Sequence, residues 1–277
     1  MTQHFSLSSE QRDEFERRGV LCLKGLLSAG AVGRARARIV HQLERMGVSE
    51  AGGWRLPDGS RPRYPATGLK TSRVVGNKHP EILALMEEPA LGATVDELLD
   101  ARAFDRAIFK QPQVLFTLPN AETWTVPDGW HCDIPRLAGG GAPGVQLFAC
   151  LDRVAPGGGG TLVIAGSHRL LNERRSMRMK EMKRHLIAHD YFRRLYSPQA
   201  EERAGVLHET SVIGDVAVTL VELAGEPGDA YFVDLRVLHS GAPNAAPRPR
   251  MMLTYRFARA DLMRDMAEAF GWREESV

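Results

Sequence analysis

The pattern of hydrophobic and polar residues changes near residue 105 of the chain. Before that point apolar residues recur at helical spacing, and serine or proline stands where helices would begin. The pattern predicts one short strand, Val20–Leu23, among four helices. The helices are expected at Glu10–Arg18, Ala29–Gly47, Pro80–Met86 and Ala90–Leu99.

After residue 105 short apolar runs alternate with turns rich in glycine and proline. Many short strands separated by such turns are typical of a β-sandwich or jelly roll. A longer stretch between them, residues 169–196, is predicted to be helical. The expected strands are Ala107–Phe109, Gln113–Leu118, Val145–Leu151, Thr161–Ile164, Val216–Leu223, Ala230–Phe232, Val237–His239 and Met251–Phe257.

No repeat, low-complexity tract or clear linker divides the sequence. We therefore expect residues 1–277 to form one domain, and its fold class to be mainly β with flanking helices. Residues 1–104 would form a mostly helical supporting layer. Residues 105–260 would form a jelly-roll core that carries the helical insertion at residues 169–196.

Composition restricts the class of protein. The chain is 43% hydrophobic and 25% charged, and its net charge of +2 is too small to predict nucleic acid or a membrane surface as the main partner. Its three cysteines form no C-x-x-C pair, which favours reduced thiols in a cytoplasmic protein. The polar start predicts no secretory signal, and no apolar run approaches the roughly 20 residues of a membrane helix.

The segment Trp130-His131-Cys132-Asp133 is the first candidate for chemistry. On a strand, residues two apart point to the same face, so His131 and Asp133 would converge. His239, at the end of another expected strand, could supply a third ligand. Two histidines and one carboxylate leave open positions on a metal, as in non-haem iron(II) oxygenases.

Other histidine clusters compete with this assignment. His79 and Glu81 flank Pro80 where a helix is expected to begin, which favours a structural role. His185 and His189 are spaced as one face of a helix, but no H-E-x-x-H frame accompanies them, so a solvated or partly packed face is favoured.

An arginine follows the third candidate ligand by eleven residues. A 2-oxo acid cosubstrate that chelates iron needs a fixed cation for its far carboxylate, and the planar guanidinium suits that task. Arg250 lies at the start of the expected strand Met251–Phe257 and is the preferred candidate. Arg248 is a close rival that could instead lie at the surface.

Four segments, in order, resemble the phytanoyl-CoA dioxygenase (phytanoyl-CoA hydroxylase) family of iron(II)/2-oxoglutarate oxygenases. Leu7–Leu27 is similar to that family's first helix and strand, and Trp130–Asp133 matches its WHxD motif. Gly158–His168, GGGTLVIAGSH, resembles its NGxLxxxPGSH motif, with Ala165 in place of the usual proline. Gly228–Arg250 resembles GDxxxFxxxxxHxSxxNxSxxxR. Together the segments span nearly all of the chain.

The resemblance implies a double-stranded β-helix in which iron(II) is held by His131, Asp133 and His239. It implies 2-oxoglutarate as cosubstrate, bound by Arg250, with O2 as oxidant and succinate and CO2 as products. Thr161 matches a position where some members bind the cosubstrate through a hydroxyl, although a plain strand residue is an equal alternative. Asp133 disfavours halogenation, because halogenating relatives have a small residue there.

The sequence departs from the family pattern at two positions near the expected centre. Gly241 stands where several relatives have serine, and Phe148 where some have tryptophan. These departures put secondary contacts in doubt, not the ligands. Trp124 and Arg136 flank the first ligand segment on loops and could contact substrate, or be ordinary loop residues.

The substrate is predicted only as a small organic or acyl molecule. Arg169–Arg194 contains nine Lys or Arg against three Asp or Glu, a local charge of 9 − 3 = +6. This segment could meet an anionic, CoA-linked or carrier-linked substrate, but a solvated helical face is favoured. The rival functions are a cupin-like metal-binding protein without turnover and a metal-dependent hydrolase, for which the sequence offers no general base at a defined spacing.

Overall fold

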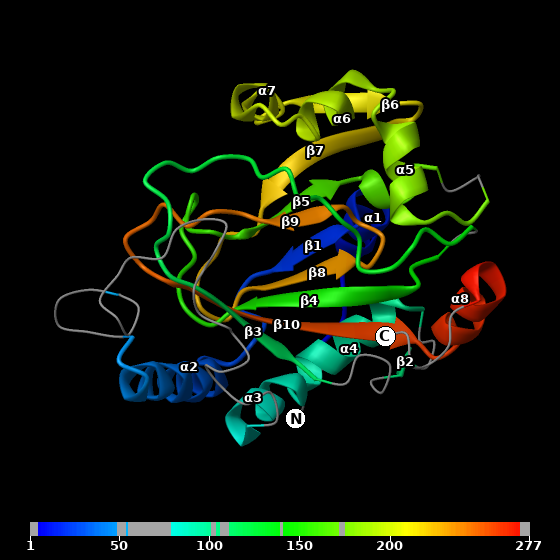
Figure 1. The fold of residues 1–277 in the computed structure, drawn as a ribbon. Helices are drawn as coiled ribbons and strands as arrows, with labels where there is room; N and C mark the ends of the chain where they lie inside the picture. The colour runs from blue at the N-terminus through cyan, green and yellow to red at the C-terminus, as the bar shows by residue number, and fades with distance from the viewer. Residues whose placement is uncertain are drawn as a thin grey trace.

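A computed structural model of the chain describes residues 5–48, 54, 79–100, 104–105, 111–138, 141–171 and 175–271. Two antiparallel sheets face each other in it, and helices lie on both outer sides (Figure 1). This architecture confirms the predicted fold class, mainly β with flanking helices around a jelly-roll core.

The larger sheet has the strand order β1-β8-β4-β10-β2, and β3 also pairs with β10. The smaller sheet has the order β6-β7-β5-β9. The strands of the larger sheet are β1 (Val20–Leu23), β2 (Phe104–Asp105), β3 (Gln113–Thr117), β4 (Gly144–Cys150), β8 (Ala230–Asp234) and β10 (Arg250–Arg259). Those of the smaller sheet are β5 (Thr161–Ala165), β6 (Thr210–Ile213), β7 (Val216–Glu222) and β9 (His239–Gly241).

The two faces of the larger sheet carry different side chains, because successive residues of a strand point in opposite directions. Leu147 and Ala149 of β4 join the main hydrophobic core beneath the sheet. Phe148 and Cys150 point the other way and pack with Val163 of the smaller sheet. The space between the sheets is therefore lined by alternate residues of β4, β10 and β5.

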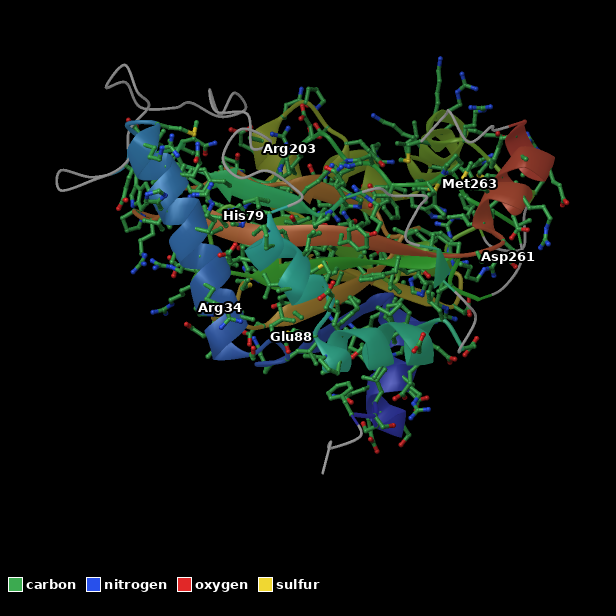
Figure 2. The ribbon with its side chains drawn as sticks, turned by 90° about the horizontal axis from the view of Figure 1, so that it is seen from below. Arg34, His79, Glu88, Arg203, Asp261 and Met263 are labelled. Carbon is green, nitrogen blue, oxygen red and sulfur yellow. The ribbon has the colours of Figure 1, made fainter. Side chains whose placement is uncertain are left out.

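Helices cover the outer face of the larger sheet, as Figure 2 shows from below. They are α1 (Ser9–Arg18), α2 (Ala29–Arg45), α3 (Pro80–Met86) and α4 (Pro89–Leu98), each within two residues of its predicted bounds. Ser8 caps α1 with a capping box to Gln11, and Ser28 caps α2. We infer that this layer and the strands form one domain, because α2–α4 share the hydrophobic core of β4 and β10.

The outer face of the smaller sheet is covered by α5 (Met179–Leu186), α6 (Asp190–Leu195) and α7 (Ala200–Ala204). The long helical stretch expected at residues 169–196 is thus divided: a short 3-10 turn (Ser167–Arg169) is followed by α5 and α6. Extended backbone at His189, with φ −94° and ψ 137°, separates these two helices. Because the stretch is divided, Met182 of α5 and Phe192 of α6 pack in the same hydrophobic core as Leu162 of β5.

Four elements have no counterpart in the predicted set: β2, β6, α7 and the C-terminal helix α8 (Leu262–Phe270). The predicted strand Ala107–Phe109 lies outside the described residues. No helix in the described part of the chain is both long and apolar enough to cross a membrane.

Candidate metal centre

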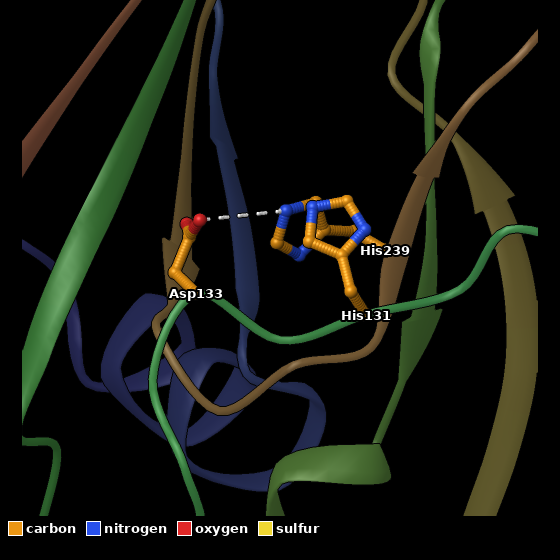
Figure 3. Close-up of side chains that lie close together, drawn as sticks. All are labelled: His131, Asp133 and His239. Atoms are coloured by element: carbon orange, nitrogen blue, oxygen red, sulfur yellow. Dashed lines mark ion pairs between the residues drawn. The ribbon is translucent and has the colours of Figure 1, made fainter. Parts of the chain in front are cut away.

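The three predicted ligand residues lie together between the sheets. His131, Asp133 and His239 each offer a ligand atom, and these atoms all lie within 4.8 Å of one another (Figure 3). They form the one such group of three found among the described residues. His239 and Asp133 are buried to more than nine tenths of their side chains, whereas His131 is exposed, so the group opens to solvent on one side.

A single backbone pair joins the two segments that carry the histidines. The amide of His131 donates to the carbonyl of His239 at 3.0 Å, and the amide of His239 donates back at 2.8 Å. The two imidazole rings lie 4.3 Å apart between centroids. The position of His131 is therefore set by β9, which carries His239 as its first residue.

The prediction that His131 and Asp133 share one face of a strand is wrong. His131 forms an isolated bridge, and the chain from Cys132 to Pro135 bends instead of continuing as a strand. Pro127 and Pro135 flank the segment and have no amide hydrogen for a ladder. Asp133 reaches the histidines from this loop.

Hydrogen bonds and burial prepare His239 for a metal. Its Nδ1 lies 3.1 Å from the carbonyl oxygen of Val237, so Nδ1 donates to that carbonyl and Nε2 faces Asp133 Oδ1 at 3.9 Å. Burial lowers the pKa of His239, although Asp133 opposes the shift. The neutral imidazole, which is the form that binds metals, is thereby favoured.

The two carboxylate oxygens of Asp133 differ in their hydrogen bonding. Oδ1 accepts a hydrogen bond from Arg256 Nη2 at 2.7 Å. Oδ2 is buried and has no hydrogen-bond partner among the described residues. A buried carboxylate oxygen without a partner is costly, and a divalent cation held by Asp133 and the two imidazoles would offset that cost. The donor set therefore fits a metal such as iron(II).

Arg250, the first residue of β10, lies in the same interior. Its side chain points to the same inner face of β10 as that of Met252. Arg250 Nη1 donates to the carbonyl oxygen of Gly159 at 2.7 Å, and Nη2 donates to Thr117 Oγ1 at 2.9 Å. Its Nε is buried and has no partner among the described residues. Burial lowers the pKa of Arg250 to about 10, and these two hydrogen-bond acceptors are both neutral.

The rival arginine lies elsewhere. Arg248 is exposed and pairs with Asp152 at 3.1 Å, on the outside of the molecule. Of the two candidates, Arg250 is the one whose guanidinium is enclosed and, within the described part of the chain, has no acidic hydrogen-bond partner. An interior cation of this kind suits the far carboxylate of a cosubstrate.

The smaller sheet places Thr161 on the side of the metal ligands. Val163 lies opposite His239 and Thr161 opposite Gly241 in the β5–β9 pair, so these side chains share one face. Thr161 is buried and lines the space between the sheets. A Cβ added at Gly241 would have no neighbour within 4 Å, so the absence of a serine there leaves room.

The family model for phytanoyl-CoA dioxygenase matches residues 15–252, which is most of the chain. The chain belongs to the phytanoyl-CoA dioxygenase family. This membership confirms the family and the enzyme class that the motifs predict, the iron(II)- and 2-oxoglutarate-dependent dioxygenases. No curated protein sequence matches the chain.

Solved structures of low sequence identity share the fold of this family member. SnoK, a non-heme, alpha-ketoglutarate-dependent carbocyclase from nogalamycin biosynthesis, is 18% identical with a TM-score of 0.57, over 92% of this chain and 85% of its own. EctD from S. alaskensis, solved with bound iron, is 18% identical with a TM-score of 0.55, over 93% and 79%. HygX from Streptomyces hygroscopicus, solved with nickel and 2-oxoglutarate, is 16% identical with a TM-score of 0.51, over 92% and 88%.

The Gly-Ser-His motif of the family joins the two ligand segments in this chain. Ser167 Oγ accepts the amide hydrogen of Leu238, the residue before His239, at 2.9 Å. Arg136, just beyond Asp133, is buried and donates to the carbonyl of Ser167 at 2.9 Å and to that of His168. Arg136 was predicted as a possible substrate contact, but these bonds direct its guanidinium to the backbone.

The family's asparagine, Asn244, holds together the backbone segments around Arg250. Asn244 is fully buried, and its Nδ2 donates to the carbonyls of Thr117 at 3.0 Å and Arg248 at 2.9 Å. A Cβ added at Gly159, where φ is +80°, would lie 3.0 Å from the Cβ of Asn244. The glycine run thus brings the carbonyl of Gly159 up to Arg250. Both motifs are visible in the sequence, but the roles of Asn244 and Ser167 are not, because their partners are distant in sequence.

Two aromatic residues noted in the sequence, Phe148 and Trp124, have different environments. Phe148 lies on β4 of the larger sheet, and its ring packs edge-on against the ring of His239, with 6.3 Å between the centroids. Trp124 is half-buried beside Gly157, and its Nε1 has no hydrogen-bond partner among the described residues. Trp124 stays a candidate for substrate contact.

The basic segment Arg169–Arg194 is largely paired within the protein. Arg175 contacts Glu181, Arg194 contacts Glu209 at 2.7 Å, and Lys183 lies over the ring of Tyr196 at 4.2 Å. These contacts favour the solvated face over a substrate lid. His185 and His189 lie on different helices, α5 and the start of α6, so they do not form one helical face.

Proposed function

We propose that this chain is an active dioxygenase that hydroxylates a small organic or acyl substrate, with iron(II) held by His131, Asp133 and His239. The far carboxylate of 2-oxoglutarate is assigned to Arg250. The observation that carries the proposal is the pairing of a three-ligand group with a buried arginine that has only neutral hydrogen-bond acceptors. A dicarboxylate cosubstrate would bridge these two features.

The bound metal and cosubstrate supply the oxidising power: 2-oxoglutarate, O2 and a C–H bond become succinate, CO2 and an alcohol. The residues of the chain bind and orient. His239 stays neutral at ordinary pH because burial lowers its pKa. Arg250 fixes the distal end of the cosubstrate by two-pronged, charge-assisted hydrogen bonds, and the sheets exclude water from it. Thr161, on the same face, is proposed to add a hydroxyl contact.

Known members of the fold support a small-molecule substrate without identifying it. SnoN is described as an alpha-ketoglutarate-dependent epimerase solved with Fe3+, alpha-ketoglutarate and nogalamycin RO, and HygX was solved with hygromycin B. Since SnoK is described as a carbocyclase, one fold accommodates several outcomes. Hydroxylation is the outcome proposed for this chain.

Anaerobic titration tests the proposal. Apoprotein titrated with iron(II) and then 2-oxoglutarate should develop a weak visible charge-transfer band, which zinc(II) should not produce. Admission of O2 should yield succinate across a panel of candidate substrates. Asp133→Ala, compared at equal circular dichroism, should give neither signal. A band without O2-dependent succinate would identify a binding protein, and hydrolysis with zinc(II) alone would identify a hydrolase.

A further inference from the structure

A second arginine of β10 contacts the candidate metal centre directly. Arg256 lies six residues after Arg250, so both side chains are on the inner face of the strand. Arg256 Nη2 donates to Asp133 Oδ1 at 2.7 Å, and the two side chains are 21% and 8% exposed. A charge-assisted hydrogen bond of this length in a largely buried place is among the strong ones.

The arginine is the rigid member of this pair. Its backbone pairs with Gln146 of β4 in the middle of the larger sheet, and the Gln146 side chain donates to Thr254 of the same strand at 3.1 Å. Asp133 instead lies in a loop between two isolated bridges, that of His131 with β9 and that of Arg136 with Met177. The sheet therefore determines where Arg256 lies, and Arg256 determines how the loop carboxylate is oriented.

The orientation matters because a carboxylate can bind a metal through one oxygen or through both. On a bound metal, two imidazoles and one carboxylate oxygen would leave open the positions that 2-oxoglutarate and O2 need. A second carboxylate oxygen would close one of them. Arg256 engages Oδ1, which also lies 3.9 Å from His239 Nε2, whereas Oδ2 is buried without a hydrogen-bond partner among the described residues. Binding of a metal through both oxygens would therefore compete with the hydrogen bond from Arg256.

We propose that Arg256 is a positioning residue that restricts Asp133 to binding the metal through one oxygen and so keeps a coordination position open for the cosubstrate. The proposal rests on the metal centre of the proposed function. It predicts that losing Arg256 weakens 2-oxoglutarate binding much more than it weakens binding of the metal alone, because Asp133 can then use both oxygens. A residue needed only for folding would weaken both together.

Manganese(II) allows a test that does not depend on turnover. Metal binding to the apoprotein is followed by the electron paramagnetic resonance signal of free Mn2+. Binding of 2-oxoglutarate to the Mn2+-loaded protein is followed by calorimetry. Two variants are compared. Arg256→Met removes the positive charge, and Arg256→Lys retains it. Arg259→Met is the matched control, because Arg259 lies on β10 but points to the other face and pairs with Asp261 and Asp265.

Arg256→Met should raise the dissociation constant of 2-oxoglutarate by about tenfold, which matches in size the smaller losses of metal affinity or activity that follow removal of a partner of a metal ligand. Its Mn2+ affinity should be maintained or increased. Arg256→Lys should recover part of the cosubstrate affinity, and Arg259→Met should match the unaltered chain in both measurements.

Unchanged cosubstrate affinity in Arg256→Met would overturn the role. So would a parallel loss of Mn2+ affinity, cosubstrate affinity and melting temperature, which would identify a folding defect. Failure of the unaltered chain to bind Mn2+ would overturn the metal centre itself, which separates that failure from a failure of the role of Arg256.

Discussion

Replacing Arg250 by methionine should separate cosubstrate binding from stability. The side chain keeps its length but loses its charge and its hydrogen bonds to Gly159 and Thr117. In the ligand-free protein a buried cation with neutral hydrogen-bond acceptors is unfavourable, so its removal should not destabilise the fold. With 2-oxoglutarate present the same cation is the partner of a carboxylate, so its removal should abolish binding.

The magnitudes follow from the surroundings of the guanidinium. Burial lowers the pKa of Arg250 from 12.5 to about 10, which corresponds to a cost of about 3 kcal/mol for keeping the charged form in the folded state. The lost hydrogen bonds, which leave the carbonyl of Gly159 without this donor, oppose that gain by about 1–3 kcal/mol. The free energy of unfolding of ligand-free Arg250→Met should therefore equal or exceed that of the unaltered chain.

Thermal unfolding is a direct assay. For the unaltered chain with Mn2+, 2-oxoglutarate at 100 times its dissociation constant should add about 2.7 kcal/mol. This gain should raise the melting temperature by about 5–10 °C for a protein of this size. Arg250→Met should show no rise on adding 2-oxoglutarate. Arg248→Met, which removes the surface arginine paired with Asp152, should show the full rise.

Two results would refute the reasoning. A ligand-free Arg250→Met that melts more than about 5 °C lower would mean that the arginine stabilises the fold, contrary to the cost derived from its burial. A rise equal to that of the unaltered chain would mean that 2-oxoglutarate binds without Arg250. In either case the interior cation would need another explanation.

Three further outcomes are expected. Asp133→Ala should lose Mn2+ binding, measured by paramagnetic resonance, with an unchanged circular dichroism spectrum; retained binding would exclude Asp133 as a ligand. Ser167→Ala leaves the Leu238 amide without its acceptor and should lower the free energy of unfolding by about 1–3 kcal/mol in urea titrations, against no change if that bond is unimportant. Burial lowers the pKa of His168, so the unfolded chain takes up its proton first and stability falls as pH drops below 6.5; His168→Gln should flatten that fall, and an equal slope would contradict this.

Local signals made much of the fold predictable. Ser8 and Ser28 cap the first two helices, and Pro80 begins the third, because capping and proline preferences act within a few residues of chain. Strand positions were also predictable, because strands such as β4, β5 and β8 are buried along their whole length and appear in the sequence as short apolar runs between turns rich in glycine and proline. Two of the elements that were missed, β6 and α7, are short. They lie at the edge of the smaller sheet and on its outer side, where the sequence has no long apolar run.

The candidate site was predictable as a set of residues but not as a geometry. The spacing of His131 and Asp133 fits a strand, and only the location of their backbone partners shows that the segment bends after one bridge. The Arg256–Asp133 contact joins residues far apart in sequence, so no local pattern announces it. The contacts of Arg136 were not predictable either. The carbonyl oxygens that accept its hydrogen bonds belong to Ser167 and His168, in a turn that is distant in the sequence.

Strand β10 has a consequence for how this protein tolerates changes in length. It pairs with β4 along one side and with β3 and β2 along the other, so its register is held from both sides. A slip by one residue would turn Arg250 and Arg256 outward into the helix-covered core, and a slip by two would displace both by about 7 Å. Insertions and deletions should therefore be excluded from β10 itself. In the surface stretch around residues 245–248 they should alter the connection between His239, the candidate third ligand, and Arg250, while leaving the spacing of Arg250 and Arg256 intact.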